Sequence, residues 1–315
     1  MELIRGLQNL RETHRGCVLT IGNFDGMHLG HRALVECALQ ASKRLGLPAA
    51  ALTFEPSPRE YFSPTDAPPR VQTFRTKIAA LAASGLQRTV IARFSRALAT
   101  MSADEFVEVL LVKTLGVASV VVGHDFRYGR QRAGDGHTLQ AAAAQHGFEL
   151  RVLDKICVGN ERSSSTALRE ALAVPDLPRA ARLLGRPYTV LGRVRRGLQL
   201  GRKLGMPTAN IDLLRPLALR QGVYAVRCRV DGGIVWDGVA SLGIRPTLGL
   251  TRCLLEAHLF GEPGDLYGRE LEVEFCAWLR PELKFNSLDE LSARMQQDAD
   301  DARRILALST LKTTT

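Results

Sequence analysis

Residues 18–31 read Val-Leu-Thr-Ile-Gly-Asn-Phe-Asp-Gly-Met-His-Leu-Gly-His, and this stretch decides the fold of the first half of the chain. An apolar run stops at Gly22, a turn follows, and apolar residues then recur with helical spacing from Leu34 onward. The pattern predicts a buried strand, a turn and a helix, with His28 and His31 at the helix N-terminus. Because unpaired backbone N–H groups and the positive end of the helix dipole lie there, such a site attracts phosphate.

Length and composition indicate an ordinary globular protein of two domains. The chain has 315 residues, of which 45% are hydrophobic and 23% charged, and it contains neither a low-complexity tract nor an apolar run of membrane-spanning length. The first residues do not form a signal peptide, and the six cysteines form no CxxC pair. We therefore expect a soluble cytoplasmic protein with reduced thiols and no structural zinc.

The net charge of +10 is spread over the whole chain. Residues 1–185 carry 23 Lys and Arg against 17 Asp and Glu, and residues 186–315 carry 19 against 15. Nucleic-acid binders usually concentrate such charge in one patch or arm. An even excess is compatible with a solvated basic surface or with affinity for small polyanions such as nucleoside triphosphates, and charge alone leaves both open.

Strands and helices alternate through residues 1–185. Further strands are predicted at 47–54, 88–94, 118–123 and 148–153, and helices at 74–83, 102–115, 139–146 and from the Ser163–Thr166 run through Leu172. This order predicts a Rossmann-like α/β module with a parallel sheet and helices on both faces. Ligands of such sheets bind at the carboxyl ends of the strands. The turns that follow the first, fourth and fifth strands should therefore converge on one rim.

The pattern changes at Arg186-Pro187, which divides the chain into predicted domains 1–185 and 186–315. Short alternating runs in the second domain predict strands at 224–230, 234–236, 254–260 and 270–278, the first two joined by the hairpin turn Asp231-Gly-Gly233. Such a series is typical of a small antiparallel β-barrel. A C-terminal helix over residues 287–308 is expected to close it.

The two histidines admit three interpretations. As metal ligands they lack a nearby acidic or cysteine cluster with metal-site spacing. As core residues they are implausible, because Gly-Asn-Phe-Asp-Gly before them is turn material. As phosphate contacts they fit, since an imidazole can donate a hydrogen bond to a phosphate oxygen where charge builds up in a transition state.

A second polar group follows the fifth predicted strand. It contains hydroxyls at a helix start with cations on either side, namely Arg162, Ser164, Ser165, Thr166 and Arg169. The group can form an anion cradle or simply cap the helix. Together with the histidines it suggests nucleotidyl transfer, in which one group holds the attacked α-phosphate and the other the departing pyrophosphate. The chain has no G-x-x-x-x-G-K-[ST] motif, so it is no P-loop enzyme.

The pattern Gly22-x-Phe24-Asp25-x-x-His28-x-Gly-His31 resembles the signature of the HxGH nucleotidyltransferases. With Val122–Gly129 and Arg162–Arg169 it resembles the N-terminal module of the bacterial bifunctional riboflavin kinase/FAD synthetase family. The resemblance implies adenylylation of FMN, with Gly22, Phe24, Asp25 and both histidines at ATP. It also implies that Ser164, Thr166 and Arg169 hold the β- and γ-phosphates, and that Pro56, Pro58, Asp125 and Tyr128 line the flavin or nucleotide pocket. Ser57 and Tyr128 stand where the family usually has His and Phe.

The string Gly201-Arg-Lys-Leu-Gly-Met-Pro-Thr-Ala-Asn210 is the second unusual stretch. Gly201 and Gly205 would let the backbone approach phosphate closely, and Thr208 and Asn210 carry oxygens suited to Mg²⁺. The alternative is an ordinary glycine-rich loop between strands.

Phosphoryl transfer also needs a residue that accepts or orients the attacking hydroxyl. Glu256 is the candidate, because in a strand over 254–260 it would share one face with His258 and Phe260. The alternative is a carboxylate on the barrel rim.

The Gly201–Asn210 string closely resembles the riboflavin kinase signature, and Glu256 matches the proposed base of that family. Resemblance also implies that residues 279–285, with Arg280 and Phe285, close over the flavin. Ser241 departs from the usual Asn. The resemblance covers roughly residues 15–305 and predicts a two-step enzyme that uses Mg²⁺ and the substrates riboflavin, FMN and ATP.

Three other functions make different demands on the sequence. Another HxGH nucleotidyltransferase with a different phosphorylated acceptor would have no use for the Gly201–Asn210 string. A class I aminoacyl-tRNA synthetase would need a KMSKS-like loop, which is absent from the sequence. A basic nucleic-acid-binding protein would show steeply salt-dependent binding. We expect no nucleic-acid, membrane or obligate protein partner.

Overall fold

The computed structural model describes residues 1–197, 201, 204–247 and 250–311. The chain divides into two compact units. The first comprises Met1–Pro68 and Lys77–Ser164, and the second comprises Pro69–Thr76 and Ser165–Thr315. Within the described ranges, every helix is too short or too polar to cross a membrane.

The first unit is built on a six-stranded sheet in which all neighbouring strands are parallel. In spatial order the strands are β1 (Glu2–Arg5), β4 (Arg88–Ala92), β3 (Ala49–Phe54), β2 (Cys17–Ile21), β5 (Val117–Gly123) and β6 (Glu149–Leu153). The parallel sheet and five of its strands confirm the prediction. The sixth strand, β1, was not predicted, because four residues are too few to show a periodic pattern.

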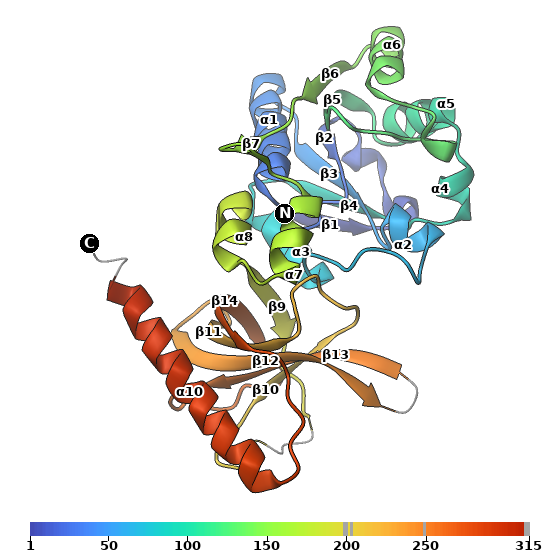
Figure 1. The fold of residues 1–315 in the computed structure, drawn as a ribbon. Coiled ribbons are helices and arrows are strands. Elements are labelled where there is room, and N and C mark those ends of the chain that lie inside the picture. The colour runs from blue at the N-terminus through green and yellow to red at the C-terminus, as the bar shows by residue number, and fades with distance from the viewer. Residues whose placement is uncertain (198–200, 202–203, 248–249, 312–315) are drawn as a thin grey trace. The chain divides into compact units, whose positions relative to one another are not determined.

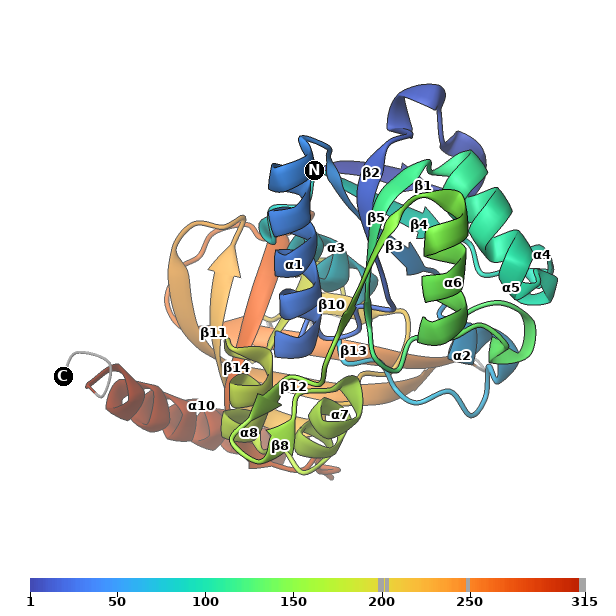
Figure 2. The same cartoon turned by 90° about the horizontal axis from the view of Figure 1, so that it is seen from above.

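Helices cover both faces of this sheet, as predicted (Figure 2). They are α1 (Leu29–Leu45), α2 (Pro58–Phe62), α3 (Phe74–Ala83), α4 (Arg96–Thr100), α5 (Ala103–Glu105), which continues into the π-helical η3 (Phe106–Thr114), and α6 (Gly136–His146). The 3₁₀ turns are η1 (Leu7–Asn9), η2 (Glu12–His14) and η4 (Arg130–Arg132), and β7 (Cys157–Val158) pairs with β8 (Glu161–Arg162). Val18 of β2 packs beneath α1, whereas Leu19 packs with η3 and α6. This alternation gives the sheet two buried faces.

The second unit contains an antiparallel sheet that closes into a barrel. Its strands, in spatial order, are β10 (Ala209–Leu213), β13 (Leu250–Leu259), β12 (Val235–Thr247), β11 (Gly222–Val230), β14 (Glu270–Arg280) and β9 (Thr189–Arg193). The Arg195 backbone N–H donates to the Asn210 carbonyl at 2.8 Å and joins the two edges. The predicted barrel is therefore confirmed.

Two further features of this unit follow from local sequence. Asp231 and Gly232 have φ of 46° and 73°, the left-handed values that a two-strand hairpin turn requires, which confirms the predicted turn. Helix α10 (Leu288–Leu311) lies along the barrel and buries Ala299, Ala302 and Leu306 against β11 (Figure 1). Helices α7 (Ser165–Ala173) and α8 (Leu177–Leu184) pack against each other and share the barrel's apolar cluster.

Candidate functional site

The first candidate site lies at the carboxyl ends of β2 and β5, where the strand order reverses. Such reversals open a crevice for ligands in parallel sheets. The Arg162 guanidinium donates to Asp125 at 2.5 Å, which joins the segment after β8 to the turn after β5. A Cβ on Gly30 would lie 3.2 Å from the Ser163 carbonyl oxygen, so that segment also borders α1. The three predicted turns thus meet on one rim, and the third of them contributes residues up to Ser164. Ser165, Thr166 and Arg169 belong to the second unit.

His28 and His31 occupy the helix start that the sequence predicted. His28 is the N-cap of α1, and its Nδ1 accepts the backbone N–H of His31 at 3.4 Å. The two rings stack with centroids 3.7 Å apart. A Cβ on Gly30 would come within 3.1 Å of the His28 ring, so the glycine between the histidines leaves room for that stack.

The His31 ring holds a buried polar atom, Nδ1, with no hydrogen-bond partner among the described residues. Burial first, and then the positive charges of His28 and Lys77, hold the pKa of His31 well below its usual range. His31 is therefore neutral near pH 7, with one nitrogen protonated and one bare.

The turn that presents these rings has an unusual backbone. Phe24 and Met27 have φ of 49° and 46°, in the left-handed region that non-glycine residues rarely adopt. Such conformations persist where surrounding contacts impose them, and they gather at ligand sites. Phe24 is fully buried, and its ring centroid lies 5.3 Å from that of His31. Gly22 and Asp25 lie in the same turn.

Lys77 is a cation of this site that sequence reasoning missed. The residue is only 7% exposed, and its Nζ lies 3.4 Å from the Asn23 carbonyl oxygen and 3.8 Å from Glu55 Oε2. It therefore holds positive charge directly behind the turn after β2. A lysine just ahead of the apolar run Ile78–Ala83 of α3 was the only signal in the sequence.

An aromatic cluster follows β3 and β4, and this cluster was also missed. It comprises Phe54, Tyr61, Phe62 and Phe94, with neighbouring ring centroids 5.3–5.9 Å apart. Phe62 is 64% exposed, which is unusual for a large apolar ring and leaves a face open to an aromatic ligand. Pro56 and Pro58 lie between Phe54 and Tyr61 in the chain.

Two of the three departures from the family pattern, Ser57 and Tyr128, have structural explanations. Ser57 is the N-cap of α2: its Oγ accepts the Glu60 N–H at 3.4 Å, and Glu60 Oε2 accepts the Ser57 N–H at 2.8 Å. Tyr128 is 5% exposed and stacks on Phe126, and its hydroxyl lies 3.1 Å from Thr138 Oγ1. The hydroxyl that distinguishes Tyr from Phe therefore has a partner on the first turn of α6, where Thr138 is exposed.

Asp125 and Arg169 are engaged by other residues in the structure. Burial raises the pKa of Asp125, but the hydrogen bond and charge of Arg162 outweigh it and leave the pKa below its ordinary value. Asp125 is thus an anion at neutral pH. In the second unit, Arg169 Nε donates to the Pro69 carbonyl at 2.8 Å, and Thr166 is exposed on the first turn of α7.

The second candidate site lies on the barrel. Strand register places three polar residues side by side, because Glu256 of β13 lies directly opposite Asn210 of β10 on one side and Ser241 of β12 on the other. Directly opposed residues share a face of the sheet. Residues 15 and 46 positions before Glu256 thus form one row centred on it.

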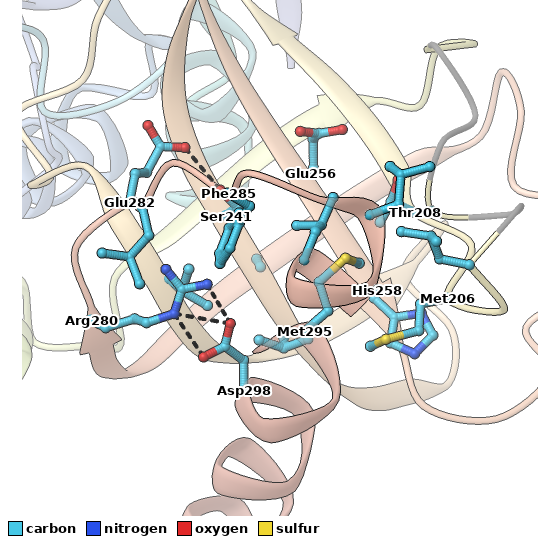
Figure 3. Close-up of a pocket in the computed structure, with 18 of the residues that line it drawn as sticks. Met206, Thr208, Ser241, Glu256, His258, Arg280, Glu282, Phe285, Met295 and Asp298 are labelled. Carbon is cyan, nitrogen blue, oxygen red and sulfur yellow. Dashed lines mark hydrogen bonds and ion pairs between the residues drawn. The ribbon is translucent and has the colours of Figure 1, made fainter. Parts of the chain in front are cut away.

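A cavity of about 730 Å³ opens over Glu256 and Ser241 of this row (Figure 3). That volume falls within the range of small-molecule sites. Gly201, Thr208, Glu256, Arg280 and Phe285 all line it, so five residues singled out from the sequence are brought together. Its other lining includes Met206, Ser241, His258, Glu282, Met295 and Asp298.

Asn210 and His258 organise the glycine-rich string beside the cavity. The Asn210 side-chain amide donates to the Thr208 carbonyl at 3.2 Å. His258 Nδ1 lies 2.9 Å from the Pro207 carbonyl oxygen, and since a carbonyl only accepts, Nδ1 carries the proton. Gly205 adopts φ of 75° in the turn before them. Arg202 and Lys203 of the string lie outside the described residues.

Comparison with known proteins relates both halves of the chain to flavin metabolism. Residues 10–167 match the family model described as FAD synthetase, and residues 184–306 match the one described as riboflavin kinase. A "Bifunctional riboflavin kinase/FMN adenylyltransferase" of Haemophilus influenzae is 45% identical over 303 residues, which cover 96% of this chain and 98% of that protein. The protein of the same name from Escherichia coli K12 is 43% identical and covers 98% and 99%.

One solved structure agrees over almost the whole length. It is titled "Crystal Structure of Macrolide-efflux Protein from Streptococcus pneumoniae" and superposes with a TM-score of 0.79 at 26% identity. The match covers 96% of this chain and 99% of that one, so the two proteins share the same succession of folds.

Proposed function

The chain belongs to the family of bifunctional riboflavin kinases/FMN adenylyltransferases, and on that basis we propose how its residues divide the two reactions. Members of this family phosphorylate riboflavin to FMN with ATP and then adenylylate FMN to FAD, and this chain does the same. The match of the second half to riboflavin kinase favours FMN over the other phosphorylated acceptors that the HxGH signature allows.

We assign adenylyl transfer to residues 1–185. An oxygen of the FMN phosphate attacks the α-phosphorus of ATP, and the bond from that phosphorus to the bridging oxygen of pyrophosphate breaks. His28 and His31 donate hydrogen bonds to the α-phosphate oxygens as charge builds on them, at the positive end of α1. Lys77 adds positive charge behind them. The position of the two stacked rings at the start of α1, directly after β2 where the strand order reverses, is the observation that carries this assignment.

The remaining residues of that half hold the two substrates. Gly22, Phe24 and Asp25 shape the nucleotide pocket, and the β- and γ-phosphates are held by Arg162, Ser164, Ser165, Thr166 and Arg169. Pro56, Pro58 and the exposed ring of Phe62 border the isoalloxazine, because a flat apolar ring system packs well on aromatic faces. Asp125 faces the flavin or nucleotide, and Tyr128 supports it from the core side.

We assign riboflavin phosphorylation to residues 186–315. Glu256 accepts the proton of the ribityl 5′-hydroxyl as that oxygen attacks the γ-phosphorus of ATP, and ADP leaves. The cross-strand row Asn210–Glu256–Ser241 carries this assignment, since it sets the carboxylate in the wall of a cavity of suitable size. Gly201 and Gly205 let the backbone approach the phosphates, while Arg280 and Phe285 stand on the flavin side.

Mg²⁺ is the metal that the kinase residues would suit. Thr208 and Asn210 offer a hydroxyl and an amide oxygen, hard donors of the kind that Mg²⁺ prefers, and their side chains lie together, with Asn210 Nδ2 at 3.5 Å from Thr208 Oγ1. When bound, the ion would neutralise charge on the transferred phosphoryl group. We further propose that the protein works in the cytoplasm on these small molecules without a nucleic-acid, membrane or obligate protein partner.

One experiment tests the division of labour. The purified protein is incubated with riboflavin and Mg-ATP, and the flavins are resolved by chromatography. The double variant His28→Ala/His31→Ala should accumulate FMN and form no FAD. FAD formation at the wild-type rate by that variant would remove the histidines from the reaction.

A further inference from the structure

The loop between β14 and α10, residues 281–287, forms one wall of the kinase cavity. Residues 282–287 all line it, although most of them are exposed to solvent, and the loop has no regular secondary structure. An exposed irregular segment samples many conformations unless contacts restrain it. The contacts that restrain this loop therefore decide whether the cavity has a defined shape.

A buried ion pair lies at the start of the loop (Figure 3). Arg280 is 9% exposed and Asp298, on α10, only 3%. Arg280 Nε lies 2.8 and 3.0 Å from the two carboxylate oxygens of Asp298, and Nη2 lies 2.5 Å from one of them. This two-pronged pairing fixes the guanidinium plane as well as its position.

The same guanidinium reaches into the loop. Arg280 Nη1 donates to the Pro281 carbonyl at 2.8 Å, and the guanidinium carbon lies 5.9 Å from the centroid of the Phe285 ring. One side chain thus contacts both the first residue of the loop and an aromatic residue near its end. Arg280 was predicted from resemblance as a flavin residue, and the structure shows that much of its hydrogen-bonding capacity is directed at the protein.

Weaker contacts hold the rest of the loop. Ser287 Oγ accepts the Glu290 N–H at 3.1 Å and caps α10, and Glu290 accepts the Asn286 N–H at 3.0 Å. Near the start of the loop, Ser241 Oγ donates to Glu282 Oε1 at 3.2 Å, and both residues are accessible from the cavity. The Arg280–Asp298 pair is the buried, charge-assisted restraint among these contacts.

We propose that Asp298 is a positioning residue for riboflavin: by holding Arg280 it fixes loop 281–287 as the wall against which the flavin binds. The inference rests on the proposed riboflavin kinase function of this cavity. Asp298 touches neither substrate in this account, and it acts through Arg280 and Phe285. Loosening the wall weakens flavin binding while Glu256 and the row around it remain intact, so the KM for riboflavin rises more than kcat falls.

Asp298→Asn in the full chain is the first test. The amide keeps the shape and one acceptor oxygen but loses the charge that Arg280 pairs with, and we expect the KM for riboflavin to rise about tenfold with kcat changed less than about threefold. Arg294→Gln is the matched control, because Arg294 Nε also contacts Asp298, at 3.1 Å, but is not a residue of the cavity wall. It should leave both constants near those of the wild type.

A second variant guards against misfolding. Arg280→Met/Asp298→Leu removes both charges together, so no buried charge is left unpaired, yet the bond to the Pro281 carbonyl is lost. It should raise the KM for riboflavin as Asp298→Asn does. The kcat for FMN formation, a reaction of the same barrel, reports whether that half of each variant is folded.

The outcomes separate this inference from the function on which it rests. A wild-type protein that makes no FMN refutes the kinase function itself. A working wild type, with Asp298→Asn changing the KM for riboflavin by less than twofold, overturns the positioning role. A lower melting temperature with an unchanged KM likewise leaves Asp298 a purely structural residue.

Discussion

Replacing Glu256 by Gln should separate the two reactions of the chain. The amide has the size and planar shape of the carboxylate and remains opposite Asn210 and Ser241, so the sheet register and the cavity wall are kept. What is lost is the ability to accept a proton from the ribityl hydroxyl. General-base catalysis is worth about 10²- to 10⁴-fold in rate, or roughly 3–5 kcal/mol in the barrier.

The assay measures FMN formation from riboflavin and FAD formation from supplied FMN in separate reactions. FMN formation should fall by at least about 100-fold, with the KM for riboflavin changed little, because the cavity is intact. FAD formation from FMN should be unchanged. An equal loss in both reactions, or a kinase rate within tenfold of the wild type, would refute the role assigned to Glu256.

Three other predictions concern the adenylylation site. Gly30→Ala should slow FAD formation from FMN about tenfold, because the added Cβ would lie 3.1 Å from the His28 ring. Gly136→Ala is the control, since the nearest atom to its added Cβ is 4.0 Å away, and it should not slow the reaction. A fully active Gly30→Ala protein would contradict the prediction. Lys77→Met should likewise reduce FAD formation about tenfold and leave FMN formation intact, because it removes the buried positive charge. Lys43→Met is the control, since Lys43 is exposed. Equal rates of FAD formation in the two variants would show that Lys77 does not belong to the site. The pKa of His31 is lowered in the folded chain, so near pH 6.5 the unfolded chain takes up a proton that the folded chain does not. The neutral, buried His31 should therefore contribute to folding stability above that pH, and the contribution should be lost as the pH falls below it. Urea unfolding of the wild type and His31→Gln at pH 8 and 5.5 checks this, and an identical pH dependence in the two proteins would show that His31 is not buried in its neutral form.

The parts of the fold that were predicted correctly have local signals. One apolar run, one glycine-rich turn and one stretch of apolar residues with helical spacing predict the strand, turn and helix over residues 18–45. The Asp231-Gly-Gly233 hairpin depends on turn residues alone. Short elements such as β1, α2 and α4 were missed, because four or five residues hold too little of a period to be recognised, and tertiary packing stabilises them.

The site residues that escaped prediction depend on contacts distant in the sequence. Lys77 belongs to the site only because α3 brings it to the Asn23 carbonyl, 54 positions away in the sequence. The row around Glu256 depends on the pairing of three strands, and the Arg280–Asp298 pair joins a strand end to a helix. The sequence pattern indicated the chemistry of Glu256. Its neighbours across the sheet could be identified only from the register of the strands.

The most direct test of the two-step account is the fate of labelled phosphate. Wild-type protein is given riboflavin, Mg²⁺ and ATP labelled at either the α- or the γ-phosphorus, and the flavins are separated over time. If riboflavin is phosphorylated first and FMN is then adenylylated, γ-label enters FMN first and is retained in FAD, whereas α-label enters FAD alone. The two-step order would be contradicted if FMN carried the α-label. It would also be contradicted if FAD carried neither the α-label nor the γ-label.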